Sequence, residues 1–200
     1  MEKLFNVLQP LGKMSPDLIV HLKKIIKPFD FKKGETILEI GDTANLILFI
    51  EEGLILSYYN VGKKQVSNWF MGKGEIFISV LSFHRQTPSV DGHLALMDCK
   101  CLGITHNELE ETFDLFPEFD RHGRKLEAEY YCLAEERQIM LKRQPKEVKF
   151  KALMDQYPDL PKYATHKQLA SFLDMGLRTF DYLWQQHFKG GGQQSATGKE

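Results

Sequence analysis

The sequence has few cysteines and no long apolar run. Its 200 residues include only Cys99, Cys101 and Cys132, and such an odd, sparse set argues against a disulfide scaffold and suits a reducing cytoplasm. No stretch approaches the ~18 uninterrupted apolar residues that a membrane span needs. The first residues also lack the apolar block and small-residue cleavage site of a secretory signal. We therefore expect a cytoplasmic protein with no membrane partner.

Sequence motifs of several large enzyme classes are also missing. The chain has no G-x-S-x-G, H-E-x-x-H or G-x-x-x-x-G-K-[ST] motif, and no H-x-H pair of the kind that a metal-binding jelly-roll enzyme would need. An iron–sulfur sensor needs four cysteine ligands where only three exist. No clustered C-x-x-C set offers a zinc site. These absences predict a protein that is not an enzyme and holds no metal.

Charge of either sign is nearly balanced. The 26 lysines and arginines face 27 aspartates and glutamates, so the formal net charge is −1. A strongly basic chain attracts nucleic acid through its overall field. Any binding to DNA here would therefore have to come from a local surface.

Short apolar runs separated by glycines fill the chain from about Pro28 to Ile104. The runs are Thr36–Ile40, Leu46–Ile50, Leu54–Tyr59, Gln65–Phe70, Ile76–Leu81, Val90–Met97 and Cys99–Ile104. Many short strands at regular spacing, with turn residues between them, predict an antiparallel sandwich or jelly roll. Within the run that starts at Val90, residues 90, 92, 94 and 96 alternate with 91, 93 and 95. This alternation predicts a strand with Val90 on its dry face.

Helices are predicted on both sides of this β region. Ser15 and Pro16 have the residue types of an N-cap and a first-turn proline. Thr105 and Glu108 form a T-x-x-E capping box that opens a short helix ending near Phe116. A longer helical pattern then starts at Pro117 and runs to about residue 144.

The long helix carries residues spaced by sevens. They are Phe119, Leu126, Leu133 and Met140, with Gly123, Tyr130 and Arg137 at the positions between them. A narrow heptad stripe is typical of a seam between two helices. We therefore predict a homodimer that pairs through residues 117–144. The alternative is that the stripe packs on the chain's own β region.

A compact helical pair is predicted within residues 145–189. Thr165 and Gln168 form a second capping box, and residues 174–176 form a short turn before a second helix, Leu177–His187. Two short helices that cross steeply need a small residue at their contact, which Ala170 supplies. Such a helix-turn-helix can place its second helix in a DNA major groove. The residues predicted to face DNA are Arg178, Thr179, Tyr182 and Gln185, with Lys167 near the DNA backbone.

In this order of parts, the sequence resembles the Crp–Fnr transcription regulators from about Leu18 to Lys189. The segments that carry the resemblance are Lys33-Gly34-Glu35, Gly41-Asp42, Phe49–Gly53 and Gly74-Glu75. Pro88-Ser89, Pro117–Phe119 and Glu135–Arg137 are similar to the variant common in Bacteroidetes. The resemblance implies an α+β chain with four parts. These are a jelly-roll, cyclic-nucleotide-binding-like β-roll (1–116), a dimerisation helix (117–144), a helix-turn-helix domain (145–189) and a flexible tail (190–200).

The resemblance also implies a ligand pocket in the β-roll. In nucleotide-binding members a glutamate holds the ribose hydroxyl and an arginine holds the cyclic phosphate. Glu75 matches the glutamate, whereas the arginine position falls near Ser89. A buried phosphodiester without a facing cation loses charge-assisted hydrogen bonds of about 1.5–3 kcal/mol each. No cofactor is therefore assigned, tight cyclic AMP binding is not expected, and the pocket is predicted for an unknown small-molecule effector. Its predicted lining is Gly74, Glu75, Ile76, Phe77, Ser89 and Val90.

Two functions remain open on the sequence. The first is a homodimeric DNA-binding regulator in which an effector-sensing β-roll controls the helix-turn-helix. The second is a ligand-binding or protein-interaction module whose degenerate helix-turn-helix no longer binds DNA. Modest local basicity motivates the second, since residues 165–189 hold three basic side chains against two acidic ones.

Overall fold

Two antiparallel sheets form the β-roll. The structure is a computed structural model in which residues 1–190 are described. Eight strands occur in this part of the chain: β1 (Lys27–Phe31), β2 (Thr36–Leu38), β3 (Leu46–Glu52), β4 (Leu54–Val61), β5 (Lys64–Gly72), β6 (Ile76–Phe77), β7 (Asp91–Ala95) and β8 (Cys99–Thr105). One sheet has the order β1-β8-β3-β6 and the other β2-β7-β4-β5. The predicted α+β chain with an antiparallel jelly roll is confirmed.

Apolar side chains from both sheets meet in the centre of the β-roll. Leu48 and Ile50 of β3 lie there with Ile55 of β4, and the two cysteines of β8 are equally buried. Each fully buried Leu or Ile side chain contributes roughly 1.5–3 kcal/mol to folding. Cys99 and Cys101 are free thiols, and burial raises the pKa of Cys101 to about 12. They therefore serve as core residues, as the sequence predicts.

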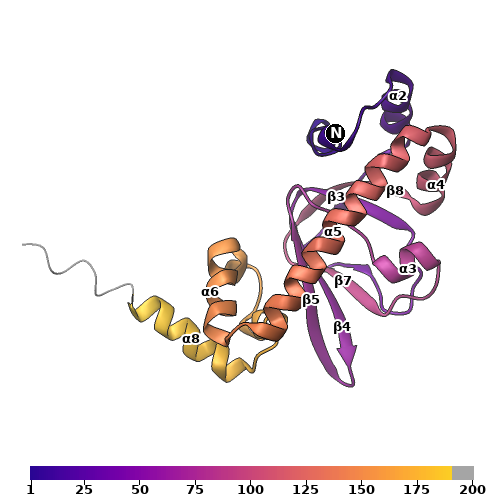
Figure 1. Cartoon of the computed structure of the whole chain (residues 1–200). Helices are drawn as coiled ribbons and strands as arrows, with labels where there is room; N and C mark the ends of the chain where they lie inside the picture. The colour runs from indigo at the N-terminus through magenta and orange to yellow at the C-terminus, as the bar shows by residue number, and fades with distance from the viewer. Residues whose placement is uncertain (191–200) are drawn as a thin grey trace, which may run out of the picture. The chain divides into compact units, whose positions relative to one another are not determined.

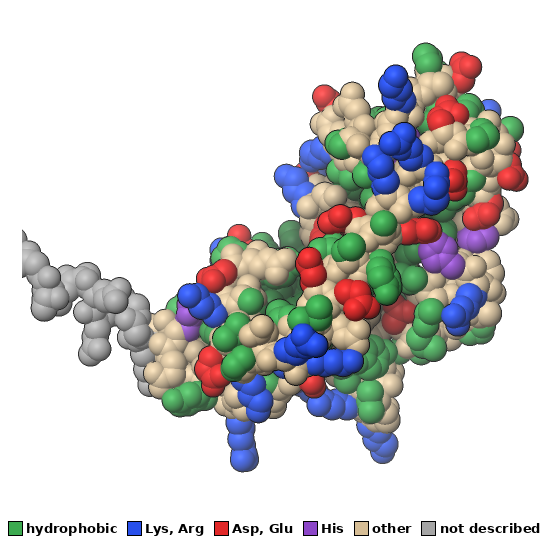
Figure 2. Space-filling view, in the orientation of Figure 1, with side chains coloured by type: hydrophobic (Ala, Val, Ile, Leu, Met, Phe, Trp, Pro, Cys, Tyr) green, Lys and Arg blue, Asp and Glu red, His purple; other side chains and the backbone are tan. Residues whose placement is uncertain are grey.

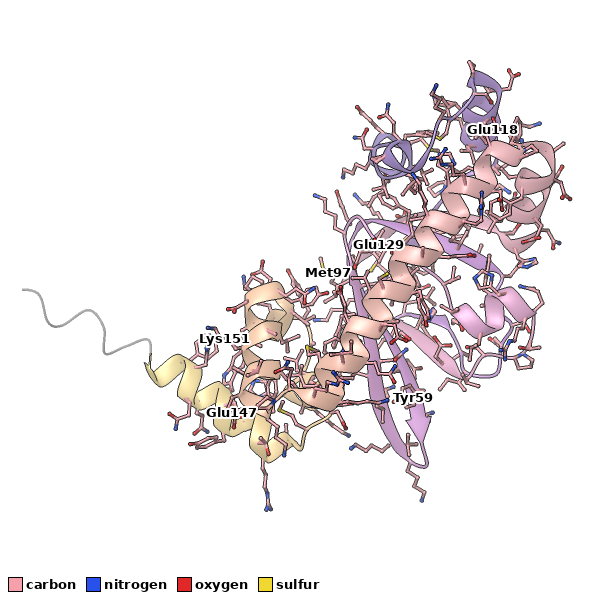
Figure 3. The ribbon with its side chains drawn as sticks, in the orientation of Figure 1. Tyr59, Met97, Glu118, Glu129, Glu147 and Lys151 are labelled. Carbon is pink, nitrogen blue, oxygen red and sulfur yellow. The ribbon has the colours of Figure 1, made fainter. Side chains whose placement is uncertain are left out.

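Helices flank the β-roll in the first unit of the chain, Met1–Ala134 (Figure 1). They are α1 (Glu2–Leu8), the short 3-10 helix η1 (Gln9–Leu11), α2 (Pro16–Ile25), α3 (Val80–Arg85), α4 (His106–Leu115) and α5 (Pro117–Arg143). The Ser15 hydroxyl accepts the Leu18 N–H at the start of α2. The predicted capping box between Thr105 and Glu108 is present in full. Glu118, at the α2 end of α5, accepts a hydrogen bond of 2.7 Å from the Ser15 hydroxyl (Figure 3).

Two predictions for the segment between β6 and β7 were wrong. The strand predicted over Ile76–Leu81 ends at Phe77, because Val80 and Leu81 open α3 instead. The predicted single dry face of β7 is also wrong, since Val90, just before β7, is 63% exposed while His93 on the other face is 3% exposed. Polar side chains can be buried there because hydrogen bonds from neighbouring elements satisfy them.

The heptad stripe of α5 packs on its own unit rather than standing free. Phe119 is buried in a core cluster with Leu4, Leu8 and Leu18, and Leu126 packs against that cluster. Farther along, the Tyr130 hydroxyl accepts a 3.0 Å hydrogen bond from the Ile76 N–H. The alternative interpretation of the stripe therefore holds for this stretch of α5. Helix pairing within this stretch would use another face, whereas Leu133 and Met140, farther along the stripe, are half-buried.

The second unit begins at Glu135, inside α5. Its further helices are α6 (Lys146–Gln156), the 3-10 helix η2 (Leu160–Lys162), α7 (His166–Phe172) and α8 (Leu177–Gly190). Leu169 and Leu173 pack with Phe150 and Phe180 in its interior, all at most 4% exposed. The capping box at the start of α7 is present as predicted. α8 extends to Gly190, the first residue of the predicted tail, and residues 191–200 lie outside the described part.

Asp174 in the turn between α7 and α8 has a positive φ of 51°. This left-handed conformation favours glycine and is tolerated best by Asp and Asn. The predicted tight turn is therefore present, with a residue that can adopt it. Among residues 1–190, no helix has the length and apolar character that crossing a bilayer requires.

Candidate functional site

The turn before β6 positions Glu75. Gly74 has a φ of +92°, and its N–H donates to the Ile50 carbonyl at 2.8 Å. The Glu75 carboxylate then accepts the Gly72 N–H at 2.5 Å. Burial raises the pKa of Glu75, and the Gly72 hydrogen bond only partly offsets this. The Glu75 side chain is therefore fixed by a hydrogen bond within its own turn. The next residue, Ile76, donates its N–H to the Tyr130 hydroxyl.

A cluster of polar side chains surrounds the Asp91 carboxylate beside this turn. Oδ1 accepts the Ser79 hydroxyl at 2.5 Å and the Ser89 hydroxyl at 2.8 Å. Oδ2 lies 3.2 Å from the Ser57 hydroxyl and 2.9 Å from Nε2 of His93. The three serines and His93 are each at most 4% exposed. We call these five residues the Asp91 cluster.

The Asp91 cluster keeps its carboxylate ionised. Burial by itself raises the pKa of Asp91, but hydrogen bonds from His93, Ser79 and Ser89 and the attraction of His93 outweigh it and lower the pKa to about 2. The partners of the carboxylate in this cluster are three hydroxyls and one imidazole, with no lysine or arginine among them. The arrangement is thus a set of hydroxyl and imidazole donors around one fixed negative charge.

The predicted pocket residues are only partly brought together. Gly74 is exposed and Glu75 and Ile76 are half-buried, whereas the Phe77 ring lies in the core with its centroid 5.3 Å from that of His93. Ser89 belongs to the Asp91 cluster, while the side chain of Val90 is exposed.

Sequence reasoning missed four members of the Asp91 cluster: Ser57, Ser79, Asp91 and His93. The available signal was the two-residue spacing of Asp91, His93 and Ala95, which share one face of a strand. By itself, such an alternating pattern places a strand face with polar groups toward solvent.

A cyclic nucleotide does not fit these residues. The resemblance places the phosphate-holding cation near Ser89, whose hydroxyl lies 2.8 Å from the Asp91 carboxylate. A phosphate there would meet an ionised carboxylate in a buried site, where like charges disfavour each other strongly. The site therefore offers a second anion no free charge partner.

The predicted DNA-facing residues lie on the surface of α7 and α8. Arg178, Tyr182 and Gln185 are exposed, and their spacing of four and three places them on one face of α8. Tyr182 is 60% exposed. Thr179 is half-buried, and Lys167 is exposed on α7. The geometry brings three of the five residues to one face.

Asp181, an acidic residue on the same helix, is held by a neighbouring side chain. Its Oδ1 lies 2.7 Å from Nδ1 of His166 at the start of α7. The imidazole also packs on Trp184, with ring centroids 4.6 Å apart. Sequence reasoning missed this pair, which directs the Asp181 carboxylate toward α7.

The comparisons with known proteins agree with this architecture. Residues 28–115 match the family model described as "Cyclic nucleotide-binding domain". No curated protein matches the sequence.

Solved structures similar to the chain include three regulators. FixK2 from Bradyrhizobium japonicum has a TM-score of 0.69 at 16% identity, with 83% of this chain and 86% of that chain covered. The c-di-GMP responsive global regulator CLP from Xanthomonas campestris has a TM-score of 0.68 at 12% identity, with 92% and 97% covered. A putative regulator of the Crp/Fnr family from Eubacterium rectale has a TM-score of 0.68 at 13% identity, with 90% and 85% covered.

At these identities the structural likeness establishes the fold. Together with the family match, it shows that residues 28–115 form a cyclic nucleotide-binding domain, in a chain whose fold is that of Crp/Fnr-type regulators.

Proposed function

We propose that this protein is a homodimeric, DNA-binding transcription regulator of the Crp–Fnr type and not an enzyme. The observation that carries the proposal is the outward face of α8, where Arg178, Tyr182 and Gln185 stand exposed behind a tight α7–α8 turn. The order of β-roll, long helix and helix pair, shared with solved regulators over most of the chain, supports the same conclusion.

The α8 face has the chemistry of a base-reading surface. Arg178 is the second residue of α8, so it lies at the helix end that enters a major groove first. An arginine there can donate two hydrogen bonds to guanine. Lys167 on α7 can contact a phosphate of the DNA backbone. Asp181 would repel such a phosphate, but its carboxylate is held by His166 at the start of α7. The tyrosine and glutamine then supply further polar contacts along the groove.

We propose that the dimer pairs through the face of α5 opposite its heptad stripe. Ala128, Tyr131, Cys132 and Ile139 are exposed on that face, Tyr131 at 67% and Ile139 at 48%. Figure 2 shows hydrophobic and acidic side chains interspersed along this part of the surface. A second copy related by a twofold axis would cover the apolar residues.

The remaining predictions are part of the same proposal. Four of them rest on the sequence alone. They are the division of the chain at residues 116, 144 and 189, the Bacteroidetes-type variant, the cytoplasmic location and an unidentified effector for the β-roll. The predicted lining of that pocket, from Gly74 to Phe77 with Ser89 and Val90, likewise stays a prediction.

The test is fluorescence anisotropy of the full chain with its own upstream DNA and with a scrambled duplex, across a salt series, with and without cyclic AMP. Selective binding that weakens as salt rises supports the regulator. Equal or absent binding to both duplexes in every condition contradicts it. If the chain does not bind DNA but α7 and α8 bind a stable protein partner, the result would instead support the protein-interaction module. The small excess of basic side chains in residues 165–189 favours that alternative.

The Arg178→Ala variant tests the α8 face itself. If Arg178 reads a guanine, the variant should lose about 1–3 kcal/mol of preference for the specific duplex. Arg85→Ala is the matched control, since Arg85 is also exposed but lies on α3 and should leave selectivity unchanged. Unchanged selectivity in Arg178→Ala would remove this residue from the interface.

A further inference from the structure

We propose that Asp91 is a resident anion that occupies the phosphate position of the cassette, so that this β-roll excludes cyclic nucleotides. The cassette is the segment from Gly74 to His93. Such exclusion is a property of the β-roll alone and does not depend on whether the second unit binds DNA.

The donors around Asp91 come from separate parts of the fold. Ser57 is on β4, Ser79 precedes α3, Ser89 follows α3, and His93 is on β7. Ser57 and Asp91, for example, are 34 positions apart in the sequence and are joined by a hydrogen bond. Two carboxylate oxygens offer about four acceptor sites, and four donor groups lie within hydrogen-bond distance of them.

The same contacts close the cassette without a ligand. The loop at Ser89 is tied down further, since its carbonyl accepts the Gly41 N–H at 2.9 Å and its N–H donates to the Asp42 carbonyl at 2.8 Å. The Gln86 side chain caps the end of α3 by donating to the Phe83 carbonyl at 2.6 Å. The Asp91 carboxylate thus binds the donors that would otherwise surround a bound anion, and it holds the segment in place without a ligand.

A second anion has no place in this arrangement. The hydroxyls and the imidazole are already used, and Arg85, the nearest basic residue in sequence, is exposed at the end of α3. Removal of the Asp91 carboxylate would leave three hydroxyls and one imidazole facing a gap. Unpaired buried donors are costly, and they match the oxygens of a phosphate or sulfate. The carboxylate is therefore the determinant of exclusion.

The first experiment titrates the wild-type full chain with cyclic AMP and cyclic GMP by calorimetry. We expect no saturable heat with either nucleotide. Saturable binding of either nucleotide would overturn the inference. This measurement uses no variant and no DNA, so its outcome is separate from that of the regulator test.

The second experiment measures the melting temperature of Asp91→Ala, with inorganic phosphate or chloride at matched ionic strength. We expect a lower melting temperature than in wild type, partly restored by phosphate but not by chloride, because a ligand that binds only the folded state stabilises it. Asp98→Ala is the control, since Asp98 is exposed and bonds to Lys32 and Lys33. It should show no phosphate-specific response.

An Asp91→Ala variant that folds and ignores phosphate would contradict the inference. If that variant does not fold, Asp91→Asn keeps the shape and removes the charge. Because its amide fills the same position, we expect a lower melting temperature than in wild type and no phosphate-specific recovery. An unchanged melting temperature in Asp91→Asn would contradict a role for the Asp91 charge.

Discussion

At the scale of single residues, the β-roll shows how a charge can be buried. An ionised carboxylate away from water is costly unless hydrogen bonds compensate it. Asp91 is compensated by four side chains, and its pKa is lowered to about 2 despite its burial. The direction of this shift means that the folded chain prefers the charged form more strongly than the unfolded chain does.

The first prediction follows from that shift. Because the folded pKa lies below the unfolded value of 3.8, the stabilisation is fully present above that value and is lost as pH falls toward about 2. Asp91 should thus contribute about 2 kcal/mol that disappears in acid. Urea unfolding of wild type and Asp91→Asn over this pH range measures it. Parallel pH profiles for the two proteins would show that the stabilisation lies elsewhere.

The second prediction concerns Asp174, which has a φ of +51°. Glycine adopts this conformation without steric cost, so Asp174→Gly should raise the free energy of unfolding, by up to about 1 kcal/mol. Asp159→Gly is the control because Asp159 has a φ of −91°, where glycine adds unfolded-state entropy. It also removes the 2.6 Å contact with Lys162, so this variant should destabilise. A lower urea midpoint in Asp174→Gly would mean that the carboxylate has a role beyond the turn.

At the scale of elements, α5 connects to the β-roll through few polar contacts. The Tyr130 hydroxyl accepts the Ile76 N–H, and burial raises the pKa of Tyr130. On the other side of the same helix, Tyr131 is largely exposed. Two adjacent tyrosines thus have opposite environments, which allows the contact to be tested directly.

The third prediction is that Tyr130→Phe loses about 1–2 kcal/mol of stability, since it leaves the partly buried Ile76 N–H without its acceptor. Tyr131→Phe removes an identical hydroxyl from an exposed site and should change stability little. Thermal unfolding of both variants gives the comparison, and faster amide exchange at Ile76 in Tyr130→Phe locates the effect. Equal losses in the two variants would argue against the contact.

At the scale of the whole molecule, the proposed assembly depends on which face of α5 is free. The stripe that includes Phe119, Leu126 and Tyr130 is used within the first unit. The opposite face holds Tyr131 and Cys132, which are exposed. A helix with one face on its own β-roll and the other on a second copy would bury both of its apolar sides.

The fourth prediction is that Tyr131→Glu and Ile139→Glu together convert the dimer into a monomer. Each copy would then bring two negative charges to the proposed interface on α5, where they would repel those of the other copy. Sedimentation velocity at micromolar protein measures the change. Val61→Glu is the control, since Val61 is similarly exposed at 60% but lies on β4. A wild-type protein that sediments as a monomer would remove the dimer from the proposal.

The amino-acid sequence by itself determined the features that depend on neighbouring residues. Both capping boxes form as predicted from four residues each, because the side chain and the backbone N–H that it satisfies lie within one turn. Most strand runs and the α7–α8 turn follow from local residue preferences in the same way, whereas the run Ile76–Leu81 does not, because Val80 and Leu81 open α3. The antiparallel β-roll was predictable from the regular spacing of these runs.

Only the tertiary structure decided which faces are buried. A strand has two faces, and β7 turns the side with Asp91 and His93 inward because Ser57 and Ser79 supply partners from elsewhere in the chain. The heptad stripe of α5 was equally ambiguous, since an apolar stripe fits a β-roll as well as a second helix. Burial of a polar group or a stripe depends on distant partners, and local sequence patterns do not contain that information.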